Sequence, residues 1–197
     1  MKILILRSKN FKKIVKIAEK SIKEGKILIC PTDTVYGLIA DATNKKAVKK
    51  VFQIKKRSFK KPIPIFVKDI KTAKRITKVD KKQEKLLKKY WPGKVTVILK
   101  PKRKFPKGIG KPKAEIGLRI PNYKIINQLL LTFGRPLTGT SANISGKIAS
   151  TKIKEIINQF RDQKYQPDLV IDAGNLTKNK PSIIIDLINS RSKVLRS

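Results

Sequence analysis

The stretch that most constrains the fold is a short apolar run that ends abruptly in a polar loop, residues 26–38, KILICPTDTVYGL. Residues 27–30 predict a buried strand, and Pro31 cannot continue its ladder of hydrogen bonds. Residues 32–34, Thr-Asp-Thr, then place hydroxyl and carboxylate groups at the carboxyl end of that strand. Because open α/β sheets bind ligands at that end, the stretch is a candidate binding loop, although a simple capped turn would have the same composition.

Helical and strand patterns alternate along most of the chain. Helical periodicity is found in segments that contain residues 11–22, 47–52, 70–76, 86–90, 125–133 and 153–160. Asn10 is expected to cap the first helix, and Thr43 or Asn44 the second. Apolar runs predict strands at the N-terminus, at 27–30, 95–99 and 115–120, and three more near the C-terminus. The pattern indicates one domain, residues 1–197, of the α/β class with a mixed sheet.

Composition excludes several kinds of site. Cys30 is the only cysteine, so the chain has neither an internal disulfide framework nor a thiolate cluster for zinc. Histidine is absent, which rules out Ser-His or Cys-His catalysis and any His-ligated metal. The N-terminus lacks the long apolar region of a secretory signal, and no apolar run is long enough to span a membrane. These features predict a cytoplasmic protein.

The formal net charge of +36 favours polyanionic partners, either nucleotide phosphates or nucleic acids. The excess is mainly lysine, accompanied by many isoleucines and asparagines. An A+T-rich genome would impose this residue usage on almost any protein. The total charge is therefore weak evidence for a nucleic-acid function, and the positions of the charges are more informative.

A second candidate loop is GTSANISG, residues 139–146, which is dense in hydroxyl groups and small residues. Successive backbone N–H groups, together with the hydroxyls of Ser141 and Ser145, can bind phosphate or carboxylate oxygens as an anion nest. A turn that caps the following helix would explain the same residues. The loop is not a Walker motif, because the Gly-Lys-Ser/Thr ending is missing.

Lys55, Arg57 and Lys61 form a basic cluster beside a segment that Pro62 and Pro64 interrupt. Prolines at these positions predict an edge strand or an irregular strand, so the cluster would be accessible. Its spacing suits a triphosphate, with the arginine supplying a planar fork and the lysines point charges. In a chain this basic, a solvated surface would also explain it.

Arg119 lies between Leu118 and Ile120 in a predicted strand and is a candidate clamp for a carboxylate. Ser182 and Arg196, each beside an apolar run, are weaker candidates of the same kind. Residues 101–114, PKRKFPKGIGKPKA, have few apolar side chains, so we expect a mobile surface loop. That loop would be either a phosphate-binding lid or a solvated insertion.

Several of these stretches are motifs that occur in a characteristic order. They are PTDTVYGL at 31–38, Lys55-x-Arg57 with KPIPI at 61–65, WPGKVTVIL at 91–99, GLRIP at 117–121, TSANISG at 140–146, PSIIIDL at 181–187 and VLR at 194–196. In this order they resemble the YrdC-like family, over nearly the whole chain. The resemblance implies a three-layer α/β fold (α+β by formal class) with a twisted mixed sheet, flanking helices and a basic concave face.

The resemblance also implies an activity. Members of the family include threonylcarbamoyl-AMP synthases, nucleotidyltransferases that combine L-threonine, bicarbonate and ATP and release pyrophosphate. Their product is used for the threonylcarbamoyladenosine modification of tRNA, by tRNA-modification proteins that take the adenylate. Adenylate formation needs a positioned triphosphate whose charge is neutralised by Lys and Arg, with Mg²⁺ expected beside ATP, and it needs no protein nucleophile.

Carried over by position, the resemblance assigns roles to individual residues. The threonine-binding residues would be Thr34, Arg119 and Ser182. The ATP-binding residues would be Arg57, Lys61, Ser141, Asn143 and Arg196, with Lys55 and Arg57 as the catalytic pair and Ser145 shaping the loop. Asp33 is the only acid in the first loop, and either orienting a water or metal or capping a turn would explain it.

Some positions depart from the family pattern. They are Ser58 in place of Pro, Phe66 where longer relatives have His, Glu115 in place of Thr and Ala149 in place of Ser. The chain stops just after Arg196, as expected for the short bacterial type that lacks a further C-terminal domain. Two alternatives stay open: a non-catalytic module that binds double-stranded RNA or tRNA, and a family member that uses a different acceptor.

Overall fold

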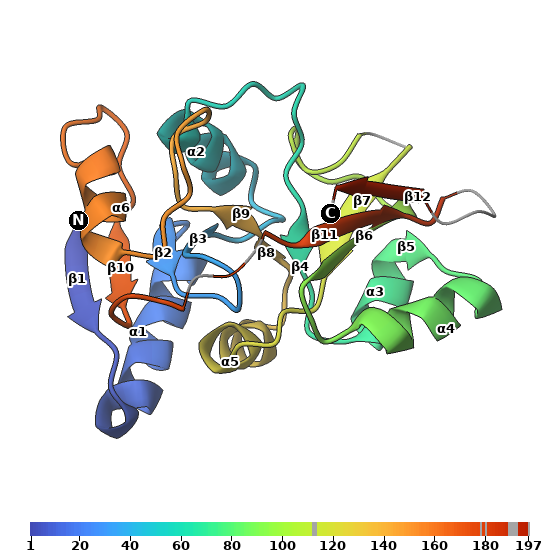
Figure 1. Cartoon of the computed structure of the whole chain (residues 1–197), viewed down its shortest axis with the longest axis horizontal. Helices are drawn as coiled ribbons and strands as arrows, with labels where there is room; N and C mark the ends of the chain where they lie inside the picture. The colour runs from blue at the N-terminus through green and yellow to red at the C-terminus, as the bar shows by residue number, and fades with distance from the viewer. Residues whose placement is uncertain (112–113, 178, 180, 189–192, 197) are drawn as a thin grey trace.

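A five-stranded sheet forms the left half of the molecule in Figure 1. The computed structural model describes residues 1–111, 114–177, 179, 181–188 and 193–196, and the side chain of Arg196 lies outside this description. In spatial order the strands are β1 (Lys2–Ile5), β10 (Leu169–Asp172), β2 (Leu28–Cys30), β3 (Gly37–Ile39) and β9 (Thr140–Ser141). The first three run parallel, and β3 and β9 are antiparallel to their neighbours.

A second mixed sheet forms the right half. Its order is β12 (Lys193–Arg196), β11 (Ile183–Asp186), β6 (Val95–Pro101), β7 (Ile116–Arg119), β4 (Ile65–Phe66) and β8 (Leu137–Thr138), and β5 (Thr77–Lys78) pairs with β6. The pairs β11–β6 and β4–β7 are parallel, and the others are antiparallel. The predicted mixed α/β fold is confirmed, and its strands divide into two sheets.

The two sheets meet where β8 lies against the residues that follow β3. The backbone N–H of Thr138 donates to Ala40 O at 2.9 Å, and the hydroxyl of Thr138 accepts from Ala40 N at 2.9 Å. The chain then passes through Gly139 from β8 in the second sheet to β9 in the first. The polar loop that follows β9 therefore lies at the junction of the two sheets.

Helices cover both faces of the first sheet and one face of the second. They are α1 (Phe11–Lys23), α2 (Lys45–Lys55), α3 (Ile70–Ile76), α4 (Lys81–Tyr90), α5 (Lys124–Phe133) and α6 (Ile153–Phe160). The pair α1 and α5 packs on one face of the first sheet, and α2 and α6 pack on the other. Alternation along β2 matches this arrangement, since Leu28 and Cys30 face the first pair and Ile29 faces the second.

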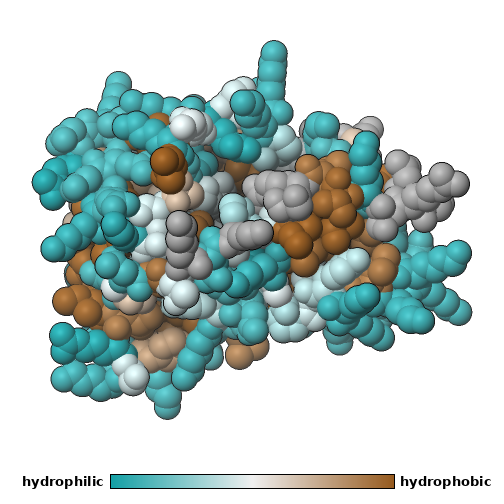
Figure 2. All heavy atoms as spheres, viewed as in Figure 1, coloured by the Kyte–Doolittle hydropathy of each residue, from teal (hydrophilic) through white to brown (hydrophobic). Residues whose placement is uncertain are grey.

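The second sheet has one open face. Val97, Leu99 and Leu118 point toward α3 and α4 and are fully buried. Thr96 and Ile98, which alternate with them along β6, point to the other side, which none of the six helices covers. Figure 2 shows hydrophobic residues gathered on this side of the molecule, over β11 and β12. A sheet covered on one face only leaves its other face available for a ligand.

Three local expectations need correction. The segment at Pro62 and Pro64, predicted as an edge strand or an irregular strand, leads into β4, a two-residue strand that lies between β7 and β8 rather than at an edge. Asn44 caps α2 through its side chain, which accepts from Lys46 N and Ala47 N, whereas the Asn10 side chain accepts from Arg7 N and caps a short 3₁₀ turn instead. The strands β3, β5, β8 and β9, two or three residues each, were not predicted.

The segment 101–114 was expected to be a mobile surface loop, and that prediction is wrong for its middle part, residues 105–110, which packs against the core. Ile109 is buried in the main core, and Phe105 packs against that core. The bridge between Ile63 and Ile109 attaches the segment to the chain before β4. Gly108 lies so close to Phe52 that an added Cβ would be 2.4 Å from that ring. Two apolar side chains and a glycine are enough to fix a loop whose other residues are mostly polar.

Candidate active site

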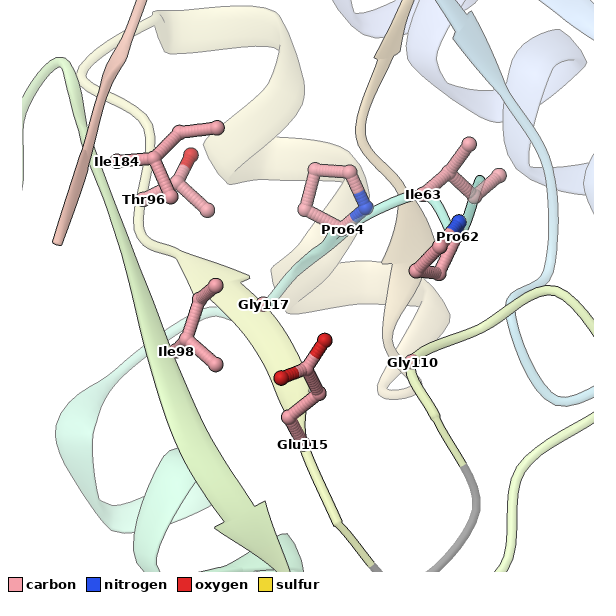
Figure 3. A pocket seen from close by; sticks show the side chains of 9 residues that line it. All are labelled: Pro62, Ile63, Pro64, Thr96, Ile98, Gly110, Glu115, Gly117 and Ile184. Atoms are coloured by element: carbon pink, nitrogen blue, oxygen red, sulfur yellow. The ribbon is translucent and has the colours of Figure 1, made fainter. Parts of the chain in front are cut away.

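The open face of the second sheet carries a small cavity of about 100 Å³, shown in Figure 3. It is lined by Pro62, Ile63, Pro64, Thr96, Ile98, Gly110, Glu115, Gly117 and Ile184. Figure 3 shows the Glu115 carboxylate pointing into the space between the prolines and Ile98. Glu115 therefore brings a negative charge into a cavity whose other lining residues are uncharged.

The loop at residues 31–36, between β2 and β3, is held by hydroxyl groups. The Thr32 hydroxyl donates to Val35 O at 2.6 Å and accepts from Thr34 N at 3.2 Å. The hydroxyls of Thr32 and Thr34 lie 3.1 Å apart. Below them, Tyr36 is fully buried, and its hydroxyl donates to Gly174 O at 2.6 Å. The predicted polar loop is thus a rigid turn between antiparallel strands, with Thr34 6% exposed.

Arg119 binds a carboxylate, and that carboxylate belongs to the same protein. Its Nη2 donates to Asp33 Oδ1 at 2.6 Å, and its Nε donates to Gly93 O at 2.8 Å. The other Asp33 oxygen accepts from Asn122 N at 2.9 Å. Arg119 is 3% exposed. Asp33, whose role the sequence left open, therefore joins the first loop to β7.

The second polar loop, residues 139–146, is held by Lys55 at the end of α2. Lys55 is 2% exposed, and its Nζ donates to Ser141 O at 2.6 Å, to Asn143 O at 2.9 Å and to Asn143 Oδ1 at 3.1 Å. The Ser141 hydroxyl donates to the same Asn143 Oδ1 at 2.6 Å. The backbone O of Lys55 accepts from Ser145 N at 2.7 Å. Lys55 therefore fixes the loop at both ends, and its ammonium points into the loop rather than into the cavity.

The charge state of Lys55 depends on two opposing effects. Burial, and secondarily the nearby Arg57 guanidinium, lower the pKa of Lys55 to about 7. Three oxygen acceptors favour the charged ammonium. Burial also lowers the pKa of Arg57, which stays charged because an arginine titrates far above neutral pH.

Arg57 and Lys61 lie on the segment that leads from α2 to the cavity. Arg57 Nε donates to Lys61 O at 2.7 Å, and its Nη2 donates to Pro62 O at 3.3 Å. These bonds fix the guanidinium along the backbone beside a cavity-lining proline. Lys61 itself is exposed. Of the predicted basic cluster, two residues are therefore available to an anion, whereas Lys55 is buried.

Ser182 directly precedes β11, and Arg196 is the last residue of β12. The Ser182 hydroxyl lies 3.1 Å from that of Thr96, which lines the cavity. Arg196 ends β12, beside β11, but the prediction for its side chain falls outside the described residues. The motifs in the sequence did not identify Thr96, although its polar side chain between Val95 and Val97 indicates that it faces away from the core.

Contacts among the described residues connect the predicted positions. Ser141 pairs with Gly37 across β3 and β9, and Gly37 lies next to the Thr32 side chain. Gly139 N donates to Pro64 O at 2.9 Å, which ties the second loop to the wall of the cavity. Two loops and two strands far apart in the sequence therefore converge on the junction of the sheets.

Phe66 occupies the floor of this junction. Its ring lies so close to Gly139 that an added Cβ there would be 2.7 Å from Phe66 Cε1. The guanidinium carbon of Arg119 lies 5.8 Å from the centre of the same ring. Phe66 is buried, so this departure from the family pattern makes the floor apolar and closely packed.

The described residues do not fit a resident magnesium ion. None of them forms a group of three or more acidic, cysteine or histidine side chains placed to hold a metal. Both oxygens of Asp33 accept hydrogen bonds from protein groups, and Glu115 pairs with Lys111 at 3.0 Å. Magnesium needs about six oxygen ligands, so a protein cage for it is lacking in this part of the chain. Likewise, no described helix has the length and hydropathy of a membrane span.

The chain is similar to several known proteins. Residues 20–197 match the family model Sua5_yciO_yrdC, described as "Telomere recombination". A putative threonylcarbamoyl-AMP synthase of Methanocaldococcus jannaschii is 42% identical over 187 residues, 95% of this chain and 86% of the relative. The threonylcarbamoyl-AMP synthase of Pyrococcus abyssi is 32% identical over 92% of this chain, which spans 53% of that longer protein.

Solved structures show the same fold. The crystal structure of P. abyssi Sua5 complexed with L-threonine superposes with a TM-score of 0.87 at 31% identity, covering 99% of this chain and 56% of that one. The crystal structure of Escherichia coli YciO superposes with a TM-score of 0.86 at 25% identity, covering 100% of this chain and 94% of that one. The two sheets and their connections are thus those of these proteins.

Proposed function

The chain belongs to the Sua5, YciO and YrdC family, its relatives are threonylcarbamoyl-AMP synthases, and we propose that it catalyses this synthesis at the junction of its two sheets. The substrates are L-threonine, bicarbonate and ATP, and the products are threonylcarbamoyl-AMP, pyrophosphate and water. The observation that carries the proposal is a set of hydrogen bonds that connects the 31–36 loop, the 139–146 loop and the Arg57–Lys61 segment with the wall of the cavity. Ala142 N donates to Tyr36 O at 2.7 Å, and the cavity-lining prolines accept from Gly139 N at Pro64 O and from Arg57 Nη2 at Pro62 O.

In the reaction, the threonine amine attacks the carbon of bicarbonate, and water leaves to give a carbamate. A carbamate oxygen then attacks the α-phosphorus of ATP, and the bond to the β-phosphate oxygen breaks to release pyrophosphate. Arg57 and Lys61 supply positive charge beside the cavity, where the triphosphate would be neutralised. The backbone N–H groups of the 139–146 loop would bind phosphate oxygens. No protein nucleophile is needed.

In this proposal Lys55 has a positioning role instead of the catalytic role that the family resemblance implies. All three of its ammonium contacts are with oxygens of the 139–146 loop. Lys55 would therefore fix Ser141 and Asn143, which in turn would meet ATP. Magnesium would enter bound to the phosphates of ATP, since the described residues offer no cage for it.

Threonine would lie against the 31–36 loop and β7. Thr34 offers a hydroxyl there, Ser182 offers another across the cavity from Pro62, and Arg119 holds the loop through Asp33. The structure of the P. abyssi relative with L-threonine supports an amino-acid site in this fold. We further propose that the adenylate passes to tRNA-modification proteins in the cytoplasm, and that contact with tRNA or double-stranded RNA is accessory to this role.

The experiment measures pyrophosphate released from ATP, with and without L-threonine and bicarbonate. Release that requires both additions supports the proposal. Arg57→Ala and Ser141→Ala should each lower turnover at least about tenfold, by removing a charge-assisted contact and a loop hydroxyl. Arg161→Ala and Ser21→Ala, which change the same residue types on α6 and α1 away from the cavity, should leave turnover unchanged. Release without threonine, or full turnover in both site variants, would contradict the proposal.

A further inference from the structure

A groove of about 640 Å³ lies beside the proposed active site and has no role in the reaction above. It runs between the segment around Phe59 and the segment around Phe105, and we call it the basic groove. It shares Pro62, Gly110 and Glu115 with the small cavity. Its walls carry five cationic side chains: Lys60, Arg103, Lys104, Lys107 and Lys111. Among the described lining residues Glu115 is the only acid, and it pairs with Lys111.

Charge alone would not distinguish this groove in so basic a protein. A second basic hollow of about 470 Å³, between α3 and α4, is also lined by five cations, including Lys71 and Lys88. That hollow contains no aromatic residue, and its one lining aliphatic residue is Ile70. The basic groove instead combines its cations with two phenylalanine rings and three prolines.

The two phenylalanine rings are fixed in place and half exposed. Phe59 stacks on Phe52 with ring centres 4.5 Å apart, and Gly108 permits this because an added Cβ would be 2.9 Å from Phe59. Phe105 packs on the main core. Each ring has a cation beside it: Lys107 Nζ lies 5.5 Å from the centre of Phe59, and the guanidinium carbon of Arg103 lies 4.9 Å from that of Phe105.

Fixed aromatic rings that alternate with cations are suited to a polyanion with flat rings. Single-stranded nucleic acid has this chemistry, since its bases stack on aromatic side chains and its phosphates meet lysine and arginine. A duplex hides the faces of its bases, so it would gain from the cations but not from the rings. We propose that the basic groove binds a single-stranded nucleic acid segment. This inference goes beyond the synthase reaction and does not depend on it.

The test uses the full chain and a fluorescein-labelled 12-nucleotide oligouridylate, with binding followed by anisotropy at several salt concentrations. Phe105→Leu should weaken binding by about 5- to 100-fold, as expected for one stacked base, whereas Phe105→Tyr keeps the ring and should bind normally. Thermal denaturation of both variants checks that they are folded. A parallel measurement with oligothymidylate of the same length shows whether the groove binds RNA or DNA more tightly, since both offer bases for stacking and phosphates.

Two double variants that remove the same charge distinguish binding in the groove from binding to the rest of the basic surface. Arg103→Gln with Lys104→Gln should reduce the slope of log K against log salt by about 1.4, since each phosphate contact contributes about 0.7 in single strands. Lys71→Gln with Lys88→Gln, which removes the same charge from the second basic hollow, should leave the slope unchanged. An equal reduction of this slope in the two double variants would overturn the proposal.

Two further outcomes would also overturn it. One is tighter binding of a blunt 12-base-pair duplex than of the single strand, with no effect of Phe105→Leu. The other is a change in the KM for ATP in the groove variants, which would make the groove part of the nucleotide site. Pyrophosphate release should be the same in these variants and in the unchanged chain. A chain that lacks synthase activity but binds the single strand through Phe105 would support the groove and contradict the proposed function.

Discussion

Asp33 and Arg119, 86 residues apart in the sequence, form a buried ion pair with 2.6 Å between Oδ1 and Nη2. Their side chains are only 8% and 4% exposed. Arg119 also donates to Gly93 O, and Asp33 accepts from Asn122 N, so each partner has a further hydrogen bond. The pair connects the loop of the first sheet to β7 of the second. The relative placement of the two sheets at the site therefore depends on it.

Replacing one member of this pair should be costly. Asp33→Asn keeps the shape of the side chain but leaves the Arg119 charge buried without its partner, which should lower the free energy of unfolding by about 3–5 kcal/mol. Urea unfolding measures this change. The same substitution at the exposed Asp162 should change stability by less than about 0.5 kcal/mol.

A double-mutant cycle tests whether the cost comes from the pair itself. Asp33→Asn combined with Arg119→Gln removes both charges, so its loss should be smaller than the sum of the two single losses by at least about 0.5 kcal/mol. Losses that simply add would show that the two residues act independently of each other.

Lys55 should make stability depend on pH. Its pKa is lowered from 10.5 to about 7 in the folded protein, mainly by burial. Between these two values the unfolded chain binds a proton that the folded chain does not, so the Lys55 contribution to stability rises with pH, by at most about 1.4 kcal/mol per unit. Below pH 7 both states hold the proton, and the contribution no longer changes.

The measurement compares the unchanged chain with Lys55→Met at pH 7, 8 and 9, by urea unfolding. Lys55→Met keeps the length of the side chain, so the difference between the two proteins isolates the titration of Lys55. The stability of the unchanged chain relative to the variant should grow over this range. A constant difference would mean that the oxygens of Ser141 and Asn143 hold the ammonium charged despite its burial.

Local patterns in the sequence were enough to predict the helices and most strands. The residues that α1 buries, Ile14, Val15, Ala18 and Ile22, are those that its periodicity indicates. Gly134 ends α5 in the left-handed conformation, with φ of 73°, as a glycine at that position suggests. These signals are carried by neighbouring residues, so a single sequence contains them.

The site was less predictable, because its contacts join distant residues. Thr34 and Ser141 were candidates because they lie in polar loops, Arg57 because it lies in a basic cluster, and Arg119 because it lies between two apolar residues of a predicted strand. What each one contacts could not be read from the sequence, since Arg119 and Asp33 are far apart in it. Lys55 was placed with Arg57 by spacing, but the helix turns its side chain inward to the 139–146 loop. The division into two sheets could not be predicted either, because β8 and β9, through which the chain passes from one sheet to the other, are only two residues long.

Gly139 should not tolerate a side chain. In Gly139→Ala the new Cβ would lie 2.7 Å from Cε1 of the buried Phe66 ring, so the ring or the 139–146 loop must move. We expect a loss of about 1–3 kcal/mol in stability, together with lower turnover because the loop carries Ser141. Adding Phe66→Leu should restore part of both losses. Gly146→Ala is the control, because an added Cβ there meets nothing within 4 Å, but the φ of Gly146 is positive, 87°. Gly146→Ala should therefore lower stability through backbone strain, and Phe66→Leu should not restore it.

The segment from Pro101 to Lys111 should behave as part of the core. Ile109 is 4% exposed in the main hydrophobic cluster and is bridged to Ile63, so Ile109→Ala should cost about 2–5 kcal/mol in urea unfolding. Lys104→Ala in the same segment, where the side chain is exposed, should cost less than about 0.5 kcal/mol. The sequence composition of the segment predicts the opposite, namely equal and small effects at both positions. Equal effects would therefore show that the segment does not pack as the structure has it, and would remove the fixed wall on which the basic groove depends.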